Sequence, residues 1–265
     1  MSEPLFFFEN DSDEVEVHEI GGGAAAVYTH RSPADKGENE DAAALIPCGP
    51  GAAVLAVADG LGGLPDGARA ARTALESLAR VLTSCDPTRL REAILDGFEE
   101  ANREVLDLGL GAATTLAVSE LHGSNVRTYH AGDSPVLLFG GRGTLKQETI
   151  AHSPVGYAVE AGLLDPEEAL HHEARHLVSN ILGSDEMRVE ISAGRELQPS
   201  DTIVLASDGL VDNLHLYEIA ALVRGGSLHQ ATQTLVDAAR ERMRGADTQM
   251  PSKPDDLTVV VYRPS

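Results

Sequence analysis

Three short apolar runs of this chain carry a carboxylate at one end. Residues 54–58 are followed by Asp59, residues 203–207 by Asp208, and residues 257–261 are preceded by Asp255 and Asp256. Apolar runs of this length, rich in β-branched residues, are typical of buried strands. Because the end of one antiparallel strand lies beside the start of its neighbour, carboxylates far apart in the sequence can meet at one edge of a sheet.

Carboxylates that meet in this way repel each other, so we expect a cation among them. Oxygen clusters are the ligands that hard cations such as Mg²⁺ and Mn²⁺ prefer. Four more acidic residues lie at comparable places beside apolar runs or close to Asp208: Glu40, Asp41, Asp133 and Asp212. A single Asp of this kind more often forms a turn, but the whole set in this order favours a metal centre.

Composition and charge narrow the class of protein. The 265 residues include 42 acidic and 20 basic ones, for a formal net charge of −22. This charge argues against nucleic acid or an anionic membrane as a partner. We find no break that divides the chain, and therefore expect one domain over residues 1–265.

The cysteines and the N-terminus point to the cytoplasm. Cys48 and Cys85 are the only cysteines, too few for a disulfide framework. Residues 1–13 lack the basic and long apolar parts of a signal peptide, and no apolar run approaches the roughly 20 residues that cross a bilayer. We therefore expect a cytoplasmic protein.

The predicted elements indicate an α+β fold. Strands are expected within residues 14–30, 42–58, 112–131, 135–139, 187–191, 201–206 and 257–261, and helices over about 66–82, 86–108, 214–224 and 228–243, with residues 155–185 mostly helical. Strands and helices come in runs rather than in regular alternation, which favours antiparallel sheets covered by helices.

One motif suggests different chemistry. Residues 172–176 fit His-Glu-x-x-His, the signature of zinc peptidases, through His172, Glu173 and His176. On a helix, the two His would lie nearly opposite the apolar stripe that includes Leu170 and Leu177. We expect them to face solvent rather than a cleft, which leaves a zinc peptidase as a remote alternative.

The acidic set, taken as a whole, resembles the metal-dependent protein phosphatases of the PP2C (PPM) family, in their bacterial form. The resembling segments, in chain order, are Asn39–Ala42, Ala58–Gly63, Ala113–Leu116, Ala131–Ser134, Ser207–Leu210 and Asp255–Thr258. Residues 161–183 resemble the helical flap of the family, which we place at about 155–190. The resemblance extends from about residue 20 to the end.

The resemblance implies a four-layer αββα sandwich with two Mn²⁺ or Mg²⁺ ions at one end, and a reaction. In this interpretation Asp59 bridges the ions, Gly60 binds one through its carbonyl, Asp208 and Asp255 bind the other, Glu40 and Asp41 hold metal-bound waters, and Asp133, Asp208 and Asp212 form a third, weaker site. Two such ions lower the pKa of a bridging water and neutralise phosphate charge. The resulting hydroxide attacks phosphoserine or phosphothreonine directly, without a covalent intermediate.

The chain departs from the family pattern at several positions. Relatives usually carry an Arg four residues before the position of Glu40, where this chain has Lys36. A Lys supplies a point charge rather than a bidentate fork, so phosphate binding should be weaker unless Arg31 contributes. Leu61 follows the first Asp-Gly pair where some relatives have His, and Asp256 replaces the usual Asn, which adds a charge beside the metals.

The expected partner is a phosphorylated protein, the target of a serine/threonine kinase, bound by a monomeric enzyme. A catalytically weak or inactive regulatory module on the same fold is the main alternative. The retention of all the expected carboxylates disfavours it.

We predict that Lys36→Ala raises KM for a phosphopeptide, because the substrate phosphate loses a positive charge. Steady-state kinetics with a phosphopeptide test this. An unchanged KM would remove Lys36 from the site.

Overall fold

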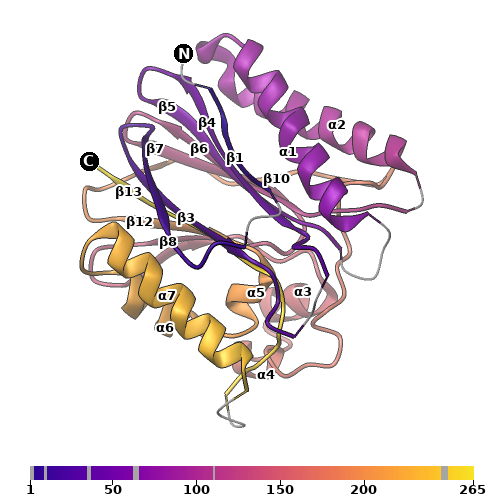
Figure 1. The fold of residues 1–265 in the computed structure, drawn as a ribbon, viewed down its shortest axis with the longest axis vertical. Helices are drawn as coiled ribbons and strands as arrows, with labels where there is room; N and C mark the ends of the chain where they lie inside the picture. Colours follow the sequence, from indigo (N-terminus) through magenta and orange to yellow (C-terminus); the bar gives the residue numbers. More distant parts are fainter. Residues whose placement is uncertain (1–2, 9–10, 35–36, 62–65, 110, 246–249) are drawn as a thin grey trace.

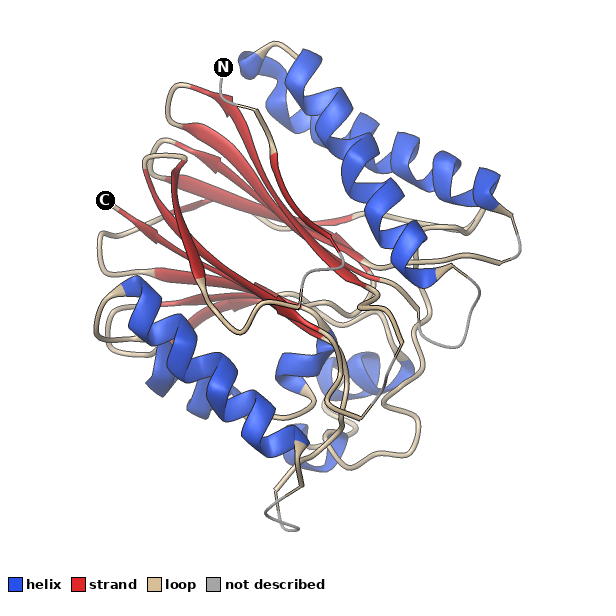
Figure 2. Ribbon diagram, viewed as in Figure 1, coloured by secondary structure: helices blue, strands red, loops and turns tan. Residues whose placement is uncertain are grey.

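The computed structural model describes the chain except for residues 1–2, 9–10, 35–36, 62–65, 110 and 246–249. Lys36 therefore lies outside the described residues. Two antiparallel sheets stack on each other, with helices on both outer faces (Figures 1 and 2). This arrangement confirms the predicted α+β sandwich.

The first sheet has seven strands in the described part of the chain. Its order is β1 (Leu5–Phe8), β4 (Asp41–Gly49), β5 (Ala52–Asp59), β6 (Leu116–His122), β7 (Asn125–Ala131) and β10 (Glu190–Ile191), with β11 (Arg195–Glu196) also paired to β7. The second sheet has six strands among the described residues, in the order β2 (Glu16–Ile20), β3 (Gly23–His30), β13 (Leu257–Pro264), β12 (Thr202–Ala206), β8 (Val136–Phe139) and β9 (Leu145–Glu148).

Helices cover the two outer faces of the stack. On the first sheet lie α1 (Gly67–Ser84) and α2 (Leu90–Leu108), which follows the short 3₁₀ turn η1 (Pro87–Arg89); on the second lie α6 (Leu216–Val223) and α7 (Leu228–Met243). The short helices α3 (Pro154–Glu160), α4 (Pro166–Ala169) and α5 (Asp208–Val211) gather at one end of the sheets (Figure 1). No described helix is both long and apolar enough to cross a membrane.

Strand β5 shows why its sequence is apolar without alternation. Val54, Ala56 and Ala58 contribute to the core between the first sheet and its helices. Ala53, Leu55 and Val57 contribute to the core between the two sheets. Successive side chains of a strand point to opposite faces, and both faces of β5 are buried. A strand in the middle of four layers must therefore be apolar at every position.

The predicted helical region at 155–185 is wrong in extent. Only α3 and α4 form there, and residues 170–180 run through turns and bends. Leu163 and Leu177 are 83% and 46% exposed, so the segment has no continuous apolar face against the core. Helical stability in proteins comes mostly from burying such a face. The helical spacing of apolar residues is therefore not sufficient to form a helix here.

The start of α1 also differs in detail from the prediction. Asp is a common N-cap residue, and the sequence predicts Asp66 as the cap of this helix. Asp66 has a left-handed backbone conformation with φ of 64° and makes no side-chain cap. Its carbonyl oxygen accepts the Ala70 N–H at 2.8 Å. The helix therefore begins at the predicted place but without the predicted side-chain bond.

The core that α1 forms with α2 and the first sheet should contribute strongly to stability. Leu78 in α1 is fully buried in this core, whereas Leu106 in α2 is 37% exposed. We expect Leu78→Ala to lower the free energy of unfolding by about 2–5 kcal/mol, through lost burial and a cavity, and Leu106→Ala to lower it by less than about 1 kcal/mol. Urea denaturation measures both losses, and losses of equal size would contradict this account of the core.

Candidate metal centre

The acidic strand ends meet at one end of the stacked sheets. Asp41 begins β4 and Asp59 ends β5, and the two residues are direct partners across the antiparallel pair. In the other sheet, Asp208 lies two residues after the end of β12 and Asp255 two residues before β13, and β12 pairs with β13. The carboxylates therefore come from both sheets, not from one sheet edge as the pattern alone suggested.

Ser207 links the acidic ends of the two sheets. Its hydroxyl donates to Asp41 Oδ2 at 2.6 Å and accepts the Thr258 N–H at 3.0 Å. The neighbouring Asp208 N–H points to Asp59 Oδ2 at 3.5 Å. Asp41 is buried, and hydrogen bonds to buried charged groups stabilise more than those between neutral groups. Ser207 therefore helps to hold Asp41 and Asp208 beside each other.

Asp59 is fixed by two threonines at the start of β6. The Asp59 N–H donates to Thr115 Oγ1 at 3.1 Å, and the Thr115 N–H donates to the Asp59 carbonyl at 2.8 Å. Thr114 Oγ1 donates to the same carbonyl at 2.9 Å. These contacts leave the Asp59 carboxylate as the part of the residue that is available to a ligand. They also give a structural role to the Thr-Thr segment that the resemblance included.

Gly60, which follows β5, and Glu40, which precedes β4, lie close in space to Gly67, the first residue of α1. The Gly60 N–H donates to the Glu40 carbonyl at 3.1 Å, and a Cβ added to Gly60 would lie 2.3 Å from the carbonyl oxygen of Gly67. A Cβ added to Gly67 would in turn lie 2.6 Å from Glu40 Oε1. Glycine is required here for close approach, and the Glu40 carboxylate lies at a helix N-terminus, which favours negative charge.

Asp256 has a role that the sequence did not reveal. Its two carboxylate oxygens accept the N–H groups of Ser32 at 2.7 Å and Glu40 at 2.6 Å. The charge expected beside the metals is thus used to hold the backbone that precedes β4. Asp256 therefore positions the backbone of Glu40, and the Glu40 carbonyl in turn accepts the Gly60 N–H.

Asp133 and Asp212 lie on the Asp208 side of the site. Asp133 is in the turn between β7 and β8, and Asp212 is the residue after α5. The charge of Asp208 raises the pKa of both carboxyl groups, after the larger effect of burial. The structure thus places Asp133 and Asp212 close enough to Asp208 for its charge to act on both.

Burial and mutual repulsion raise the pKa values of the clustered carboxyl groups. Burial first, and then the charge of Asp208, raise the pKa of Asp133 to about 7 and that of Asp255 to about 6. Burial and the charge of Asp41 raise the pKa of Asp59 well above its ordinary value. Repulsion of this kind between buried anions is relieved by bound cations, and an all-oxygen set suits Mg²⁺ or Mn²⁺.

Lys253 supplies a positive charge within the cluster. Its ammonium lies 2.6 Å from Asp208, 2.8 Å from Asp212 and 2.9 Å from Asp255. No sequence motif pointed to this residue. The available signal was a basic residue two positions before Asp255, too common a pattern to be noticed.

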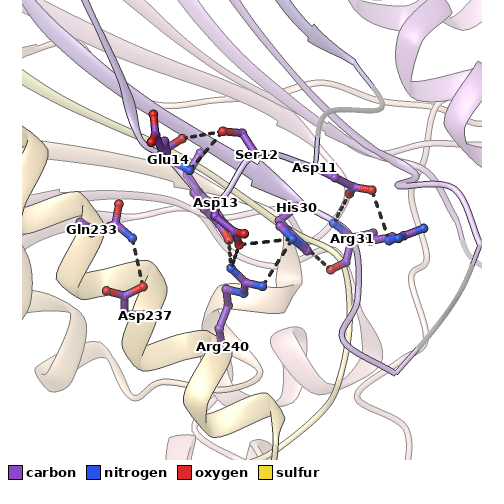
Figure 3. Close-up of polar contacts among 10 residues, drawn as sticks. Asp11, Ser12, Asp13, Glu14, His30, Arg31, Gln233, Asp237 and Arg240 are labelled. Carbon is purple, nitrogen blue, oxygen red and sulfur yellow. Dashed lines mark hydrogen bonds and ion pairs between the residues drawn. The ribbon is translucent and has the colours of Figure 1, made fainter.

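The expected phosphate-binding residues are only partly described. Lys36 lies outside the described residues. The Arg31 guanidinium pairs with Asp11, Nε to Oδ2 at 3.2 Å, and Figure 3 shows the two side chains turned toward each other. In this conformation Arg31 is engaged with the N-terminal segment rather than with the metal centre.

The His-Glu-x-x-His motif does not lie on a helix. His172, Glu173 and His176 are exposed residues in the turns after α4. His172 Nδ1 accepts the Ala174 N–H at 3.1 Å. Among the described residues, one group of three His, Cys, Asp or Glu side chains has ligand atoms that all lie within 4.8 Å of one another, and it includes neither this motif nor the clustered aspartates.

That group consists of His130, His152 and Glu190. The Gly132 N–H donates to His152 Nδ1 at 3.1 Å, so the neutral imidazole carries its proton on Nε2, which lies 3.2 Å from Glu190. A protonated nitrogen cannot bind a metal ion. The His152 carbonyl also accepts the Ser179 N–H at 2.8 Å, so the group ties the flap segment to the turn that carries Asp133.

Two cavities open beside the carboxylates. One, of about 520 Å³, includes Asp133, Asp208 and Asp212 in its wall, together with the apolar Val155 and Val159 of α3. The other, of about 640 Å³, is lined in part by ionisable side chains of both signs: His171, His172, Glu173, Arg175, His176 and Lys253.

Comparisons with known proteins agree with this architecture. A family model described as protein phosphatase 2C matches residues 31–250. A putative protein phosphatase 2C-type protein of Streptococcus pyogenes is 32% identical over 203 residues, which is 72% of this chain and 81% of the relative.

Two further similarities concern a phosphatase called PstP. The serine/threonine protein phosphatase PstP of Mycobacterium tuberculosis is 30% identical over 218 residues, 80% of this chain, which spans only 40% of the length of that relative. A crystal structure of a PstP catalytic domain in complex with two manganese ions superposes with a TM-score of 0.74 and 26% identity, over 90% of this chain and 96% of that one.

The raised pKa values predict a pH dependence of stability when divalent ions are removed. The pKa values of Asp133 and Asp255 in the folded protein exceed the ordinary value of 3.8, so the folded state binds more protons than the unfolded state between these values. Their contribution to stability is complete below about pH 4 and is lost as the pH rises through about 6 to 7. We expect the melting temperature in EDTA to fall from pH 5 to pH 8.

The Asp133→Asn variant is the test of this assignment. It should show a shallower fall of melting temperature in EDTA than the native protein, because Asn does not titrate. Excess Mn²⁺ should also reduce the fall in the native protein. Identical pH profiles for variant and native protein would contradict the assignment.

Proposed function

The chain belongs to the protein phosphatase 2C family, and from this premise we propose that it hydrolyses phosphoserine and phosphothreonine in proteins with two bound Mn²⁺ or Mg²⁺ ions. The observation that carries the proposal is the meeting of Asp59, Asp208 and Asp255 from two sheets at one end of the sandwich. Support for the ions comes from the crystal structure of the PstP domain with two manganese ions.

The proposed ligands are all oxygen atoms and fit these ions. Asp59 would bridge the ions, the Gly60 carbonyl would bind one, Asp208 and Asp255 would bind the other, Glu40 and Asp41 would hold coordinated waters, and Asp133, Asp208 and Asp212 would form the third site. When bound, the ions would supply a water of lowered pKa and neutralise phosphate charge. The repulsion that raises the carboxyl pKa values is consistent with this use.

The protein's part in the reaction is to hold these oxygens in place. The Thr114 and Thr115 contacts fix Asp59, Ser207 orients Asp41, and Asp256 holds the backbone at Glu40. Preorganised groups of this kind need no rearrangement during the reaction. Asp59 and Asp208 are accordingly the residues to which we assign catalytic importance, and Lys36 stays a prediction for phosphate binding.

The cysteines fit a direct hydrolysis rather than a covalent one. Cys48 is buried, and burial raises the pKa of its thiol to about 12. Burial also raises the pKa of Cys85. The thiolate is the nucleophilic form of cysteine, and neither thiol forms it readily. A phosphocysteine intermediate is therefore disfavoured.

The likeness to relatives named serine/threonine phosphatases supports the substrate class. The substrate would be a protein phosphorylated by a serine/threonine kinase, and its phosphate would enter past Arg175 and Lys253. Action in the cytoplasm and as a monomer stay predictions from the sequence. The inactive regulatory module is disfavoured by the complete carboxylate set.

A phosphatase assay with p-nitrophenyl phosphate tests the proposal. We expect turnover with Mn²⁺, no turnover with EDTA, and a loss of at least about 100-fold in kcat/KM for Asp59→Asn and Asp208→Ala, equivalent to about 2.7 kcal/mol of barrier. Cys85→Ser and His172→Ala serve as controls and should keep their activity.

Two other outcomes would favour the alternative functions, the inactive regulatory module and the zinc peptidase. Absence of Mn²⁺-dependent turnover in the folded native protein would favour the regulatory module. One zinc ion per chain that disappears in His172→Ala would favour the peptidase.

A further inference from the structure

The backbone of Lys253 is held by a single buried asparagine. Asn213, which is fully buried, accepts the Lys253 N–H on Oδ1 at 2.9 Å and donates through Nδ2 to the Lys253 carbonyl at 2.8 Å. The same Nδ2 donates to the Gly209 carbonyl in α5 at 2.9 Å. The stem of Lys253 thus starts from a fixed position beside the helix that begins with Asp208.

The ammonium of Lys253 reaches three carboxylates with the three donors that it has. It bonds to Asp208 Oδ2 at 2.6 Å and lies 2.8 Å from Asp212 Oδ2 and 2.9 Å from Asp255 Oδ2. The Lys253 side chain is only 23% exposed, so solvent screens these pairs less than it screens surface pairs. These charges raise the pKa of Lys253 far above its ordinary value, despite the opposite effect of burial.

Asp212 depends on this ammonium. It is 9% exposed, and its Oδ2 atom is buried and receives no directed hydrogen bond from the described residues. The ion pair with Lys253 Nζ is therefore the interaction that offsets the charge on this atom. An uncompensated buried carboxylate is strongly unfavourable, so this atom requires a cation close to it.

Asp212 belongs to the proposed third site and not to the proposed two-ion pair. The ammonium contacts Asp212 and Asp208 of that site, and it also contacts Asp255 of the pair. Asp59 and the Gly60 carbonyl are left to the pair. Asp133, the remaining member of the third site, is close enough for the charge of Lys253 to lower its pKa.

We propose that the Lys253 ammonium is the resident cation of the third site, so that this chain binds divalent ions at the two-ion pair alone. The inference rests on the proposed function for the positions of the ion sites. It assigns to a side chain of the protein the charge that a third metal ion would otherwise supply. Metal content should then be limited by Lys253 and not by the number of carboxylates.

Counting bound Mn²⁺ tests the inference without measuring activity. Equilibrium dialysis followed by mass spectrometric metal analysis should give two Mn²⁺ per native chain and three per Lys253→Met chain, because Met keeps the length of the stem and removes the charge. Lys253→Arg should keep two. In EDTA, Lys253→Met should melt below the native protein, and Mn²⁺ should restore more of its melting temperature.

Lys146→Met is the matched control. Lys146 Nζ binds both oxygens of the buried Asp201 at 2.7 Å, and this pair does not include a proposed metal ligand. The variant loses an ammonium from a buried carboxylate, as Lys253→Met does. Its melting temperature should fall, but its Mn²⁺ count should stay at two and Mn²⁺ should not restore the loss selectively.

The outcomes separate the two proposals. Three Mn²⁺ in the native protein, or two in a folded Lys253→Met, would overturn the role of Lys253 and leave the proposed function intact. A native protein that binds no Mn²⁺ would overturn both. If Lys253→Met does not fold, Asp212→Asn decides: an unchanged count of two supports the inference, and a fall from three to two overturns it.

Discussion

Repulsion between the acidic ends of two stacked sheets is the constraint on which this structure depends. Asp41 and Asp59 face each other across β4 and β5, and Asp208 and Asp255 approach them from the other sheet. Anions brought together in a partly buried place raise one another's pKa values and oppose the stacking. Bound cations or protons relieve this repulsion.

The surrounding framework holds the carboxylates against this repulsion. Ser207 bonds to Asp41 across the sheets, and the two threonines at the start of β6 hold the backbone of Asp59. These bonds hold the oxygens but do not remove their charge. The positions are therefore determined by the apolar layers and the hydrogen bonds, while the charge is left for cations.

Lys253 shows that part of this charge can be offset from within the chain. Its ammonium contacts Asp208 and Asp212 at α5 and Asp255 before β13, while Asp59 lies at the end of the other sheet. The site is thus divided between a part that already has a cation and a part that would take its cations from solution. A chain with such a lysine would then bind fewer metal ions than a chain that has the same carboxylates but no lysine among them.

The sequence by itself determined the layers of the fold and the identity of the acidic residues. Runs such as residues 52–58 must lie between two apolar layers because every position is apolar, and the carboxylates at their ends follow from the strand ends. The family resemblance added roles to them. Local patterns sufficed because each of these features is encoded within a few neighbouring residues.

The tertiary structure decided what depends on distant partners. The residues after α4 form no helix although their spacing is helical, and Leu177 of the expected apolar stripe is exposed. Asp256 accepts the backbone N–H groups of Ser32 and Glu40 across more than two hundred positions of sequence. Lys253 reaches Asp208 and Asp212 across about forty. Such pairings depend on how two sheets stack, and no local pattern of residues specifies that.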